Sequence, residues 1–109
     1  MQIAMHNCGA DLVAALTVYV ERRVRFALVR FGGRVGQVEV RICADNPALN
    51  RCRISVEILP FGRIEVEECK SDLFVAIDHA TGRLGRLFGR ELERIRDSRV
   101  GRESVRLVA

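Results

Sequence analysis

Residues 53–67 read RISVEILPFGRIEVE, and this stretch decides the fold. Isoleucine and valine alternate with serine and charged residues on both sides of the turn sequence Pro60-Phe61-Gly62. Alternation with a period of two predicts strands that bury one face. Two such runs joined by a turn of hairpin length predict an antiparallel pair. The stretch therefore predicts a β-hairpin with one apolar and one charged face.

Two segments upstream of this hairpin complete the predicted sheet. Residues 38–42 alternate in the same way, and Asp45-Asn46-Pro47 predicts a loop after them. Residues 2–6 form a shorter alternating segment. Because a helix connects residues 2–6 to residues 38–42, we expect these two strands to pair in parallel.

The first of two predicted helices lies between these two strands. Its apolar side chains recur at intervals of three and four residues, which is the spacing of one helical face. They are Leu12, Leu16, Val20, Val24, Ala27 and Phe31. Asp11 can cap the start of this helix, and Gly32-Gly33 can end it.

The second predicted helix covers residues 72–97, where Ser71 and Asp72 can cap its start. Its apolar residues are Leu73, Ile77, Ala80, Leu84, Phe88 and Ile95. The element order is therefore β-α-β-β-β-α. We predict an α+β fold in which two helices cover one face of a four-stranded sheet. Residues 98–109 show little pattern, so we expect one domain at residues 1–97 and a flexible tail at residues 98–109.

The composition fits one globular domain without a metal site. Of 109 residues, 49% are hydrophobic and 29% are charged. No signal peptide is evident, and no apolar run approaches the roughly 20 residues that a membrane span needs. The cysteines at positions 8, 43, 52 and 69 form no C-x-x-C pair, and their spacing fits a reducing cytoplasm. We expect Cys52 to be a core thiol.

The basic residues are almost all arginine. The net charge is +4, and of 18 basic residues only Lys70 is a lysine. Arginine binds phosphate bidentately and stacks on bases, so this bias favours RNA as a partner. A GC-rich genome would produce the same bias, and the arrangement of the arginines is therefore more informative than their number.

Four arginines form a stripe on the second predicted helix: Arg83, Arg86, Arg90 and Arg94. At 100° and 1.5 Å per residue they fall within about 80° of arc and span about 16 Å. The first helix adds a second set: Arg22, Arg23, Arg25 and Arg30. If the helices lie side by side, the two sets can join into one basic patch that suits RNA phosphates.

Other interpretations of these arginines stay open. Glu91 and Glu93 can pair with nearby arginines on a solvated face, or the surface can bind an acidic protein. Phe26 and Phe88 are expected in the core or at its boundary. We therefore expect RNA to be recognised through its backbone and shape rather than by stacking on an aromatic platform.

Gly82, Gly85 and Gly89 share a side of the second helix away from the arginine stripe, within about 60°. Each glycine costs about 1 kcal/mol relative to alanine in a helix interior. Three together indicate close approach of a neighbour, which is the first helix, a partner or an RNA backbone. The alternative is that the three glycines are merely tolerated.

Catalysis finds little support in the sequence. His6 and His79 are the only side chains whose ordinary pKa lies near neutrality, and neither belongs to a catalytic motif. The chain has no G-x-S-x-G sequence, glycine-rich phosphate loop or paired metal motif. We predict that the protein is not an enzyme and uses no cofactor and no small-molecule substrate.

Several segments together resemble a known family. Residues 19–24 read YVERRV, residues 27–35 read ALVRFGGRV, and residues 72–78 read DLFVAID ahead of the arginine stripe. In the β-α-β-β-β-α order, these segments resemble the short form of the ribosome hibernation promoting factors, also called sigma-54 modulation proteins or ribosome-associated inhibitors. The resemblance covers residues 1–97.

The resemblance implies a double-stranded-RNA-binding-like fold and a cytoplasmic translation inhibitor. It implies binding to the small ribosomal subunit and its rRNA, in the decoding channel used by mRNA and tRNA, where the protein stabilises inactive ribosomes during stress or in stationary phase. By position, the basic residues that face rRNA in the family match Arg23, Arg83, Arg86, Arg90 and Arg94.

A second class of function stays open, namely a protein-interaction module that acts as a regulator or homodimer without binding RNA. We expect the free protein to be a monomer. We also expect Arg83→Glu combined with Arg90→Glu to abolish ribosome binding without unfolding the chain.

Overall fold

The computed structural model of the chain describes residues 1–8, 14–46 and 48–108, apart from the side chains of residue 8, residues 45–46 and residues 98–108. In chain order the elements are β1 (Gln2–Cys8), α1 (Ala14–Leu28), the 3₁₀-helix η1 (Val29–Arg34), β2 (Val35–Asn46), β3 (Leu49–Ile58), β4 (Arg63–Lys70) and α2 (Leu73–Val108). The predicted β-α-β-β-β-α order is confirmed.

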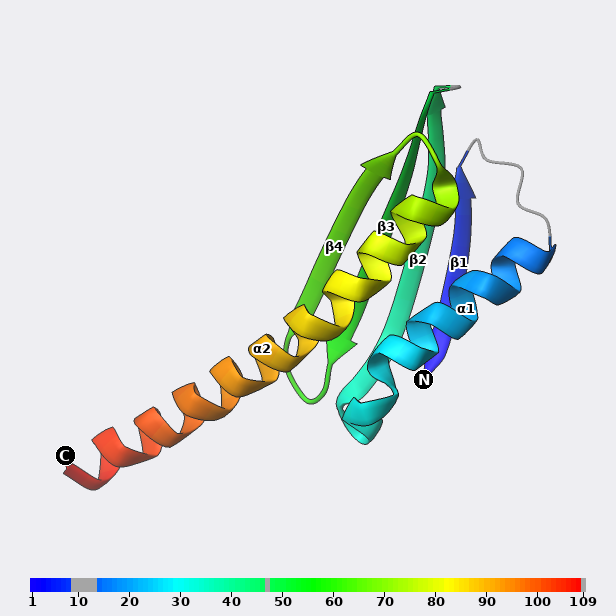
Figure 1. Cartoon of the computed structure of the whole chain (residues 1–109). Coiled ribbons are helices and arrows are strands. Elements are labelled where there is room, and N and C mark those ends of the chain that lie inside the picture. Colours follow the sequence, from blue (N-terminus) through cyan, green and yellow to red (C-terminus); the bar gives the residue numbers. More distant parts are fainter. Residues whose placement is uncertain (9–13, 47, 109) are drawn as a thin grey trace.

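The four strands form one mixed sheet in the order β1-β2-β3-β4. β1 runs parallel to β2, as the helix crossover predicts, and the other two pairs are antiparallel. In the β3–β4 hairpin, Ile54 lies opposite Val66, so the apolar positions of both strands share one face. Both helices cover that face (Figure 1), which confirms the predicted α+β fold.

The core lies between the sheet and the two helices. Alternate positions of the strands and one face of each helix are buried there. The largest fully buried side chains are Phe88, Leu28, Ile42, Ile54, Ile58, Ile77 and Leu84. Burying a side chain of this size contributes roughly 1.5–3 kcal/mol. The core therefore fixes α1 and α2 side by side on the sheet.

The other face of the sheet is open and charged, as the alternation predicts. Arg53 Nε lies 3.1 Å from Glu65 Oε1, and Arg53 Nη2 lies 3.6 Å from Glu67 Oε2. Arg63 Nη2 lies 3.9 Å from Glu39 Oε2. Because these side chains are largely exposed, each pair contributes only about 0.2–1 kcal/mol.

The first helix is shorter than predicted. α1 ends at Leu28, three residues before the predicted end at Phe31, and the chain continues as η1. Within η1, Gly32 has a φ of 51°, a left-handed conformation that glycine adopts without strain. The two glycines therefore belong to the connection into β2. The predicted cap Asp11 and the apolar residue Leu12 lie outside the described residues.

The connection between β2 and β3 also differs from the prediction. We predicted a loop at Asp45-Asn46-Pro47, but β2 continues through Asn46, which lies opposite Leu49 of β3. Pairing with β3 therefore extends the strand past residues that favour turns. Pro47 lies outside the described residues.

The second helix begins where the sequence predicts and extends further. The backbone N–H of Phe74 donates to Asp72 Oδ1 at 2.8 Å, which confirms Asp72 as a helix cap. α2 then runs for 36 residues to Val108, instead of ending near residue 97, and its last turns extend beyond the sheet (Figure 1). The domain boundary at residue 97 and the flexibility of residues 98–109 stay predictions.

The cysteines differ in chemical state. Cys52 is a buried free thiol, as predicted, and burial raises its pKa to about 12. A thiol with this pKa is inert near neutrality, because the thiolate is the nucleophile. Cys69 is free and exposed. Cys43 is disulfide-bonded, and its backbone lies in register with that of Cys8 in the neighbouring strand. This bond corrects the expectation, drawn from the spacing of the cysteines, that they fit a reducing environment.

Candidate functional site

A groove of about 470 Å³ lies where α1 and η1 meet α2. Three arginines border it: Arg23 from α1, Arg30 from η1 and Arg86 from α2. The other lining residues are Phe26, Ala27, Val29, Thr81, Gly82 and Gly85. The groove therefore combines positive charge from three elements with an apolar wall and a glycine-lined wall.

Two of the three glycines on α2 explain why the helices approach so closely. A side-chain carbon added at Gly85 would lie 3.2 Å from the backbone oxygen of Ala27 in α1. At Gly89 it would lie 3.6 Å from the ring of Phe31. At Gly82 it would meet nothing within 4 Å. Close approach to the first helix and η1 is thus confirmed for Gly85 and Gly89, whereas Gly82 opens onto the groove.

We expect Gly85→Leu to destabilise the fold by about 1–3 kcal/mol, because the added side chain would force α1 away from α2. Chemical denaturation measures this change in the free energy of unfolding. The matched control is Gly82→Ala on the same helix, which should stabilise the protein by about 0.5–1 kcal/mol through helix propensity. Equal stability of the Gly85→Leu variant and the natural chain would contradict close helix contact at this position.

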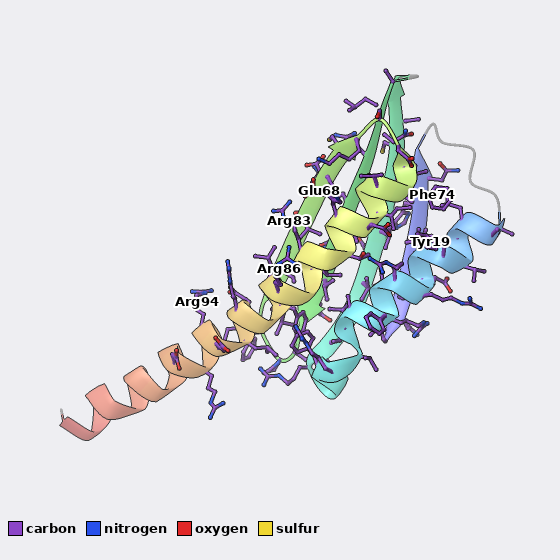
Figure 2. The ribbon with its side chains drawn as sticks, viewed as in Figure 1. Tyr19, Glu68, Phe74, Arg83, Arg86 and Arg94 are labelled. Atoms are coloured by element: carbon purple, nitrogen blue, oxygen red, sulfur yellow. The ribbon has the colours of Figure 1, made fainter. Side chains whose placement is uncertain are left out.

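Arg23 is held by a small cluster between the helices. Its Nε lies 3.3 Å from Asp78 Oδ1, and the Tyr19 hydroxyl donates to the same carboxylate. This hydrogen bond to Asp78, with some burial, raises the pKa of Tyr19. The Tyr19 ring packs edge-on against Phe74, with 5.3 Å between ring centroids; Figure 2 labels both residues. The cluster orients the Arg23 guanidinium at the groove.

A hydrogen bond to the backbone of α2 orients the Arg30 side chain. Its Nη2 donates to the backbone oxygen of Gly85 at 3.3 Å, and its guanidinium carbon lies 4.8 Å from the centroid of the Phe31 ring. A guanidinium has five N–H donors, so one bond to Gly85 leaves others for a ligand. Arg30 thus both links η1 to α2 and presents charge to the groove.

The predicted arginine stripe on α2 divides into paired and unpaired members. Arg83 Nη1 lies 2.9 Å from Glu68 Oε1 and 3.2 Å from the backbone oxygen of Glu67, so this arginine turns toward β4 (Figure 2). Arg94 pairs with Glu91 and lowers the pKa of that carboxyl. This pair bears out one part of the solvated-face interpretation.

The remaining two stripe residues differ from these. Arg86 and Arg90 are exposed and make no hydrogen bond or ion pair with any residue that the structure describes. Their guanidinium groups can bind a ligand without giving up an existing contact. They are therefore the members of the stripe best placed to bind phosphate.

Two predicted site residues on α1 lie away from the groove. At about 100° per residue, Arg22 lies about 140° and Arg25 about 160° around α1 from Ala27, which faces α2. Both side chains are exposed. Of the eight arginines, Arg23, Arg30 and Arg86 line the groove, and rRNA binding by each of the eight stays a prediction.

Phe26 corrects the expectation of a core or boundary residue, whereas Phe88 is buried as predicted. The Phe26 side chain is 79% exposed and lines the groove. The sequence could have predicted this exposure, because Phe26 lies about 160° around α1 from the buried Val24. The expectation had followed the apolar nature of phenylalanine instead of this angle.

Metal and membrane sites find no support in the described part of the chain. Within it, no group of three or more His, Cys, Asp and Glu side chains is arranged to hold a metal ion. None of the described helices combines the length and the apolar character that crossing a membrane requires.

Comparisons with known proteins agree on the fold and the family. A family model described as Sigma 54 modulation protein / S30EA ribosomal protein matches residues 1–96. The crystal structure of the Thermus thermophilus Protein Y N-terminal domain is similar to this chain, with a TM-score of 0.71 and 28% sequence identity over 83% of this chain and 98% of the other. A ribosomal subunit interface protein from Coxiella burnetii shares the fold, with a TM-score of 0.76 and 17% identity over 85% of this chain and 99% of the other. A search of curated proteins finds no match.

Proposed function

Because the chain belongs to the Sigma 54 modulation protein / S30EA ribosomal protein family, we propose that it is a translation inhibitor that binds the small ribosomal subunit. It contacts rRNA in the decoding channel that mRNA and tRNA use, and it stabilises inactive ribosomes during stress or in stationary phase. It acts in the cytoplasm as a monomer without a cofactor.

The arrangement of arginines on α2 is the observation that carries this proposal. Arg86 and Arg90 lie on α2, are exposed and have no partner among the described residues. Guanidinium groups match phosphate bidentately, so such a surface suits an RNA backbone. Arg86 also borders the groove with Arg23 and Arg30, which extends the positive surface toward α1 and η1.

Inhibition by occupancy needs no reaction at the site. A folded domain held in a channel excludes mRNA and tRNA by its volume, and its arginines occupy phosphates that these ligands approach. A few arginines alone would bind any RNA, so the fit of the domain to the channel must supply specificity. Phosphate contacts release counterions, which makes the affinity fall as salt rises.

Sucrose-gradient cosedimentation with purified subunits and whole ribosomes, at low and moderate salt, tests the proposal. We expect the protein to migrate with small subunits and whole ribosomes but not with large subunits. Ribosomes loaded beforehand with mRNA and tRNA should retain much less of it. Failure to comigrate with small subunits even at low salt would refute ribosome binding, and equal retention on loaded ribosomes would refute the decoding channel as the site.

One observation favours a protein-interaction module as the second candidate function. At the turn between β3 and β4, the Phe61 side chain is 77% exposed beside the partly exposed Leu59. Paired apolar side chains at a turn suit a protein surface more than RNA phosphates. A stable dimer without affinity for small subunits would select this function over the first.

A further inference from the structure

The groove between α1, η1 and α2 holds an aromatic side chain that the fold does not use. Phe31 and Phe88 pack against each other with 4.5 Å between their ring centroids, whereas the Phe26 side chain is 79% exposed. The neighbouring Val29 is 69% exposed and lines the same groove. An exposed ring at the wall of a concave site is available to a ligand, because no internal packing holds it.

The charges around this ring select an anionic ligand. Arg23, Arg30 and Arg86 border the groove, and none of the described residues that line it is an aspartate or a glutamate. The Nε of Arg23 is buried and makes no hydrogen bond within the described residues, although Asp78 lies close enough for an ion pair. Arg30 and Arg86 thus present two exposed guanidinium groups at the groove, and Arg23 adds positive charge although its Nε is buried beside Asp78.

The size and shape of the groove suit a single nucleotide. Its volume of about 470 Å³ lies in the range of roughly 300–1,000 Å³ that small-molecule sites occupy. Gly82 has open space where another residue would carry a side chain, so a sugar-phosphate backbone can approach α2 closely. The groove therefore brings an exposed aromatic ring, three arginines and an open glycine wall together around a volume of small-molecule size.

We propose that this groove binds an unpaired RNA nucleotide, with its base stacked on Phe26 and its flanking phosphates on Arg23, Arg30 and Arg86. This inference rests on the proposed function and adds to it a site for single-stranded RNA. It replaces the expectation of recognition by backbone and shape alone. A base stacks on an aromatic ring whatever its sequence, so the groove selects unpaired RNA over duplex RNA without reading a base.

The experiment measures binding of a short single-stranded RNA and of a duplex of the same length. Phe26→Leu keeps an apolar side chain but removes the aromatic face, and we expect it to weaken single-strand binding about 5- to 100-fold. Its salt dependence should equal that of the natural chain, because the phosphate contacts remain. The melting temperature should hardly change, since the ring is 79% exposed.

A second variant reports stacking directly. The chain has no tryptophan, so Phe26→Trp introduces a single indole at the groove. We expect it to bind single-stranded RNA at least as tightly as the natural chain, and its fluorescence to be quenched by single-stranded RNA but not by inorganic polyphosphate. Equal quenching by polyphosphate, or stronger binding of an acidic peptide than of RNA, would overturn the assignment.

The two proposals fail in distinguishable ways. Suppose that the natural chain binds ribosomes, but the Phe26→Leu variant binds single-stranded RNA as tightly as the natural chain does. This result would refute the nucleotide site and leave the proposed function standing. If the natural chain does not cosediment with small subunits, the proposed function is refuted. The measurements of RNA binding would then still show whether the groove binds single-stranded RNA. A Phe61→Leu variant is the matched control, since Phe61 is equally exposed but lies at the β3–β4 turn.

Discussion

Replacing Arg86 and Arg90 together by glutamate should abolish comigration of the protein with small ribosomal subunits and leave its melting temperature nearly unchanged. Each charge-assisted hydrogen bond to phosphate contributes roughly 1.5–3 kcal/mol, so losing two should weaken binding by about 100-fold or more. Repulsion between the new carboxylates and phosphate adds to this loss. Neither arginine has a partner among the described residues, so the fold loses no contact there.

The structure changes the choice of residues for this experiment. The sequence alone suggested reversing the charge of Arg83 together with that of Arg90, by replacing both with glutamate. Arg83, however, pairs with Glu68, whose side chain is only 17% exposed, and a glutamate at position 83 would place two carboxylates together. If that variant failed to bind, the result could come from a less stable fold or from lost phosphate contacts, and the experiment would not separate the two causes.

A matched control replaces two basic residues outside the arginine stripe by glutamate, so that the net charge changes by the same amount. Arg41→Glu lies on the open face of the sheet, and Lys70→Glu lies at the end of β4. This double variant should still comigrate with small subunits at moderate salt. Equal loss of binding in the control would indicate that net charge, and not the α2 surface, governs association. Unfolding of the Arg86/Arg90 variant would contradict their placement on the surface.

Phe88→Ala should destabilise the fold by about 3–5 kcal/mol, the largest effect on stability that we expect from one substitution. Phe88 is fully buried, and its ring packs against Phe31 of η1. The substitution removes both burial and this ring contact, and it leaves a cavity between α2 and the sheet. Unfolding free energies of 5–15 kcal/mol are usual, so the loss is a large fraction of the total.

Thermal denaturation followed by circular dichroism measures this effect. A domain of this size loses about 4–8 °C for each kcal/mol, so the melting temperature should fall by at least roughly 12 °C. Phe61→Ala is the control, because the exposed Phe61 side chain should change stability by only about 0.5 kcal/mol. A small shift for Phe88→Ala would mean that α2 does not depend on this side chain to stay on the sheet.

The fold could be predicted because its elements have clear periods. Alternation in the β3–β4 hairpin and the repeats on both helices follow from burial of one face, which the sequence records directly. The end of α2 could not be predicted by that signal. A helix that extends past its sheet has no core to contact, so its sequence carries no apolar repeat to mark it.

The site was harder to predict than the fold. The sequence placed the arginines on the right helices, except Arg30, which lies in η1. Their partners, however, depend on how α2 lies against β4 and α1. That arrangement pairs Arg83 with Glu68 and leaves Arg86 without a partner among the described residues, although both belong to the same stripe. Phe26 could have been placed by its angle on α1, whereas the groove beside it arises only when Gly85 brings the two helices together.

The length of α2 governs how the protein behaves as a particle in solution. The molecule measures 59 × 23 × 18 Å, and its radius of gyration is 16.4 Å. A compact chain of this length would have a radius of gyration of about 13 Å. An elongated particle experiences more friction than a sphere of equal mass, so a single chain would elute early from a gel-filtration column calibrated with globular standards. Light scattering, which reports mass independently of shape, is therefore the method that separates a monomer from a dimer.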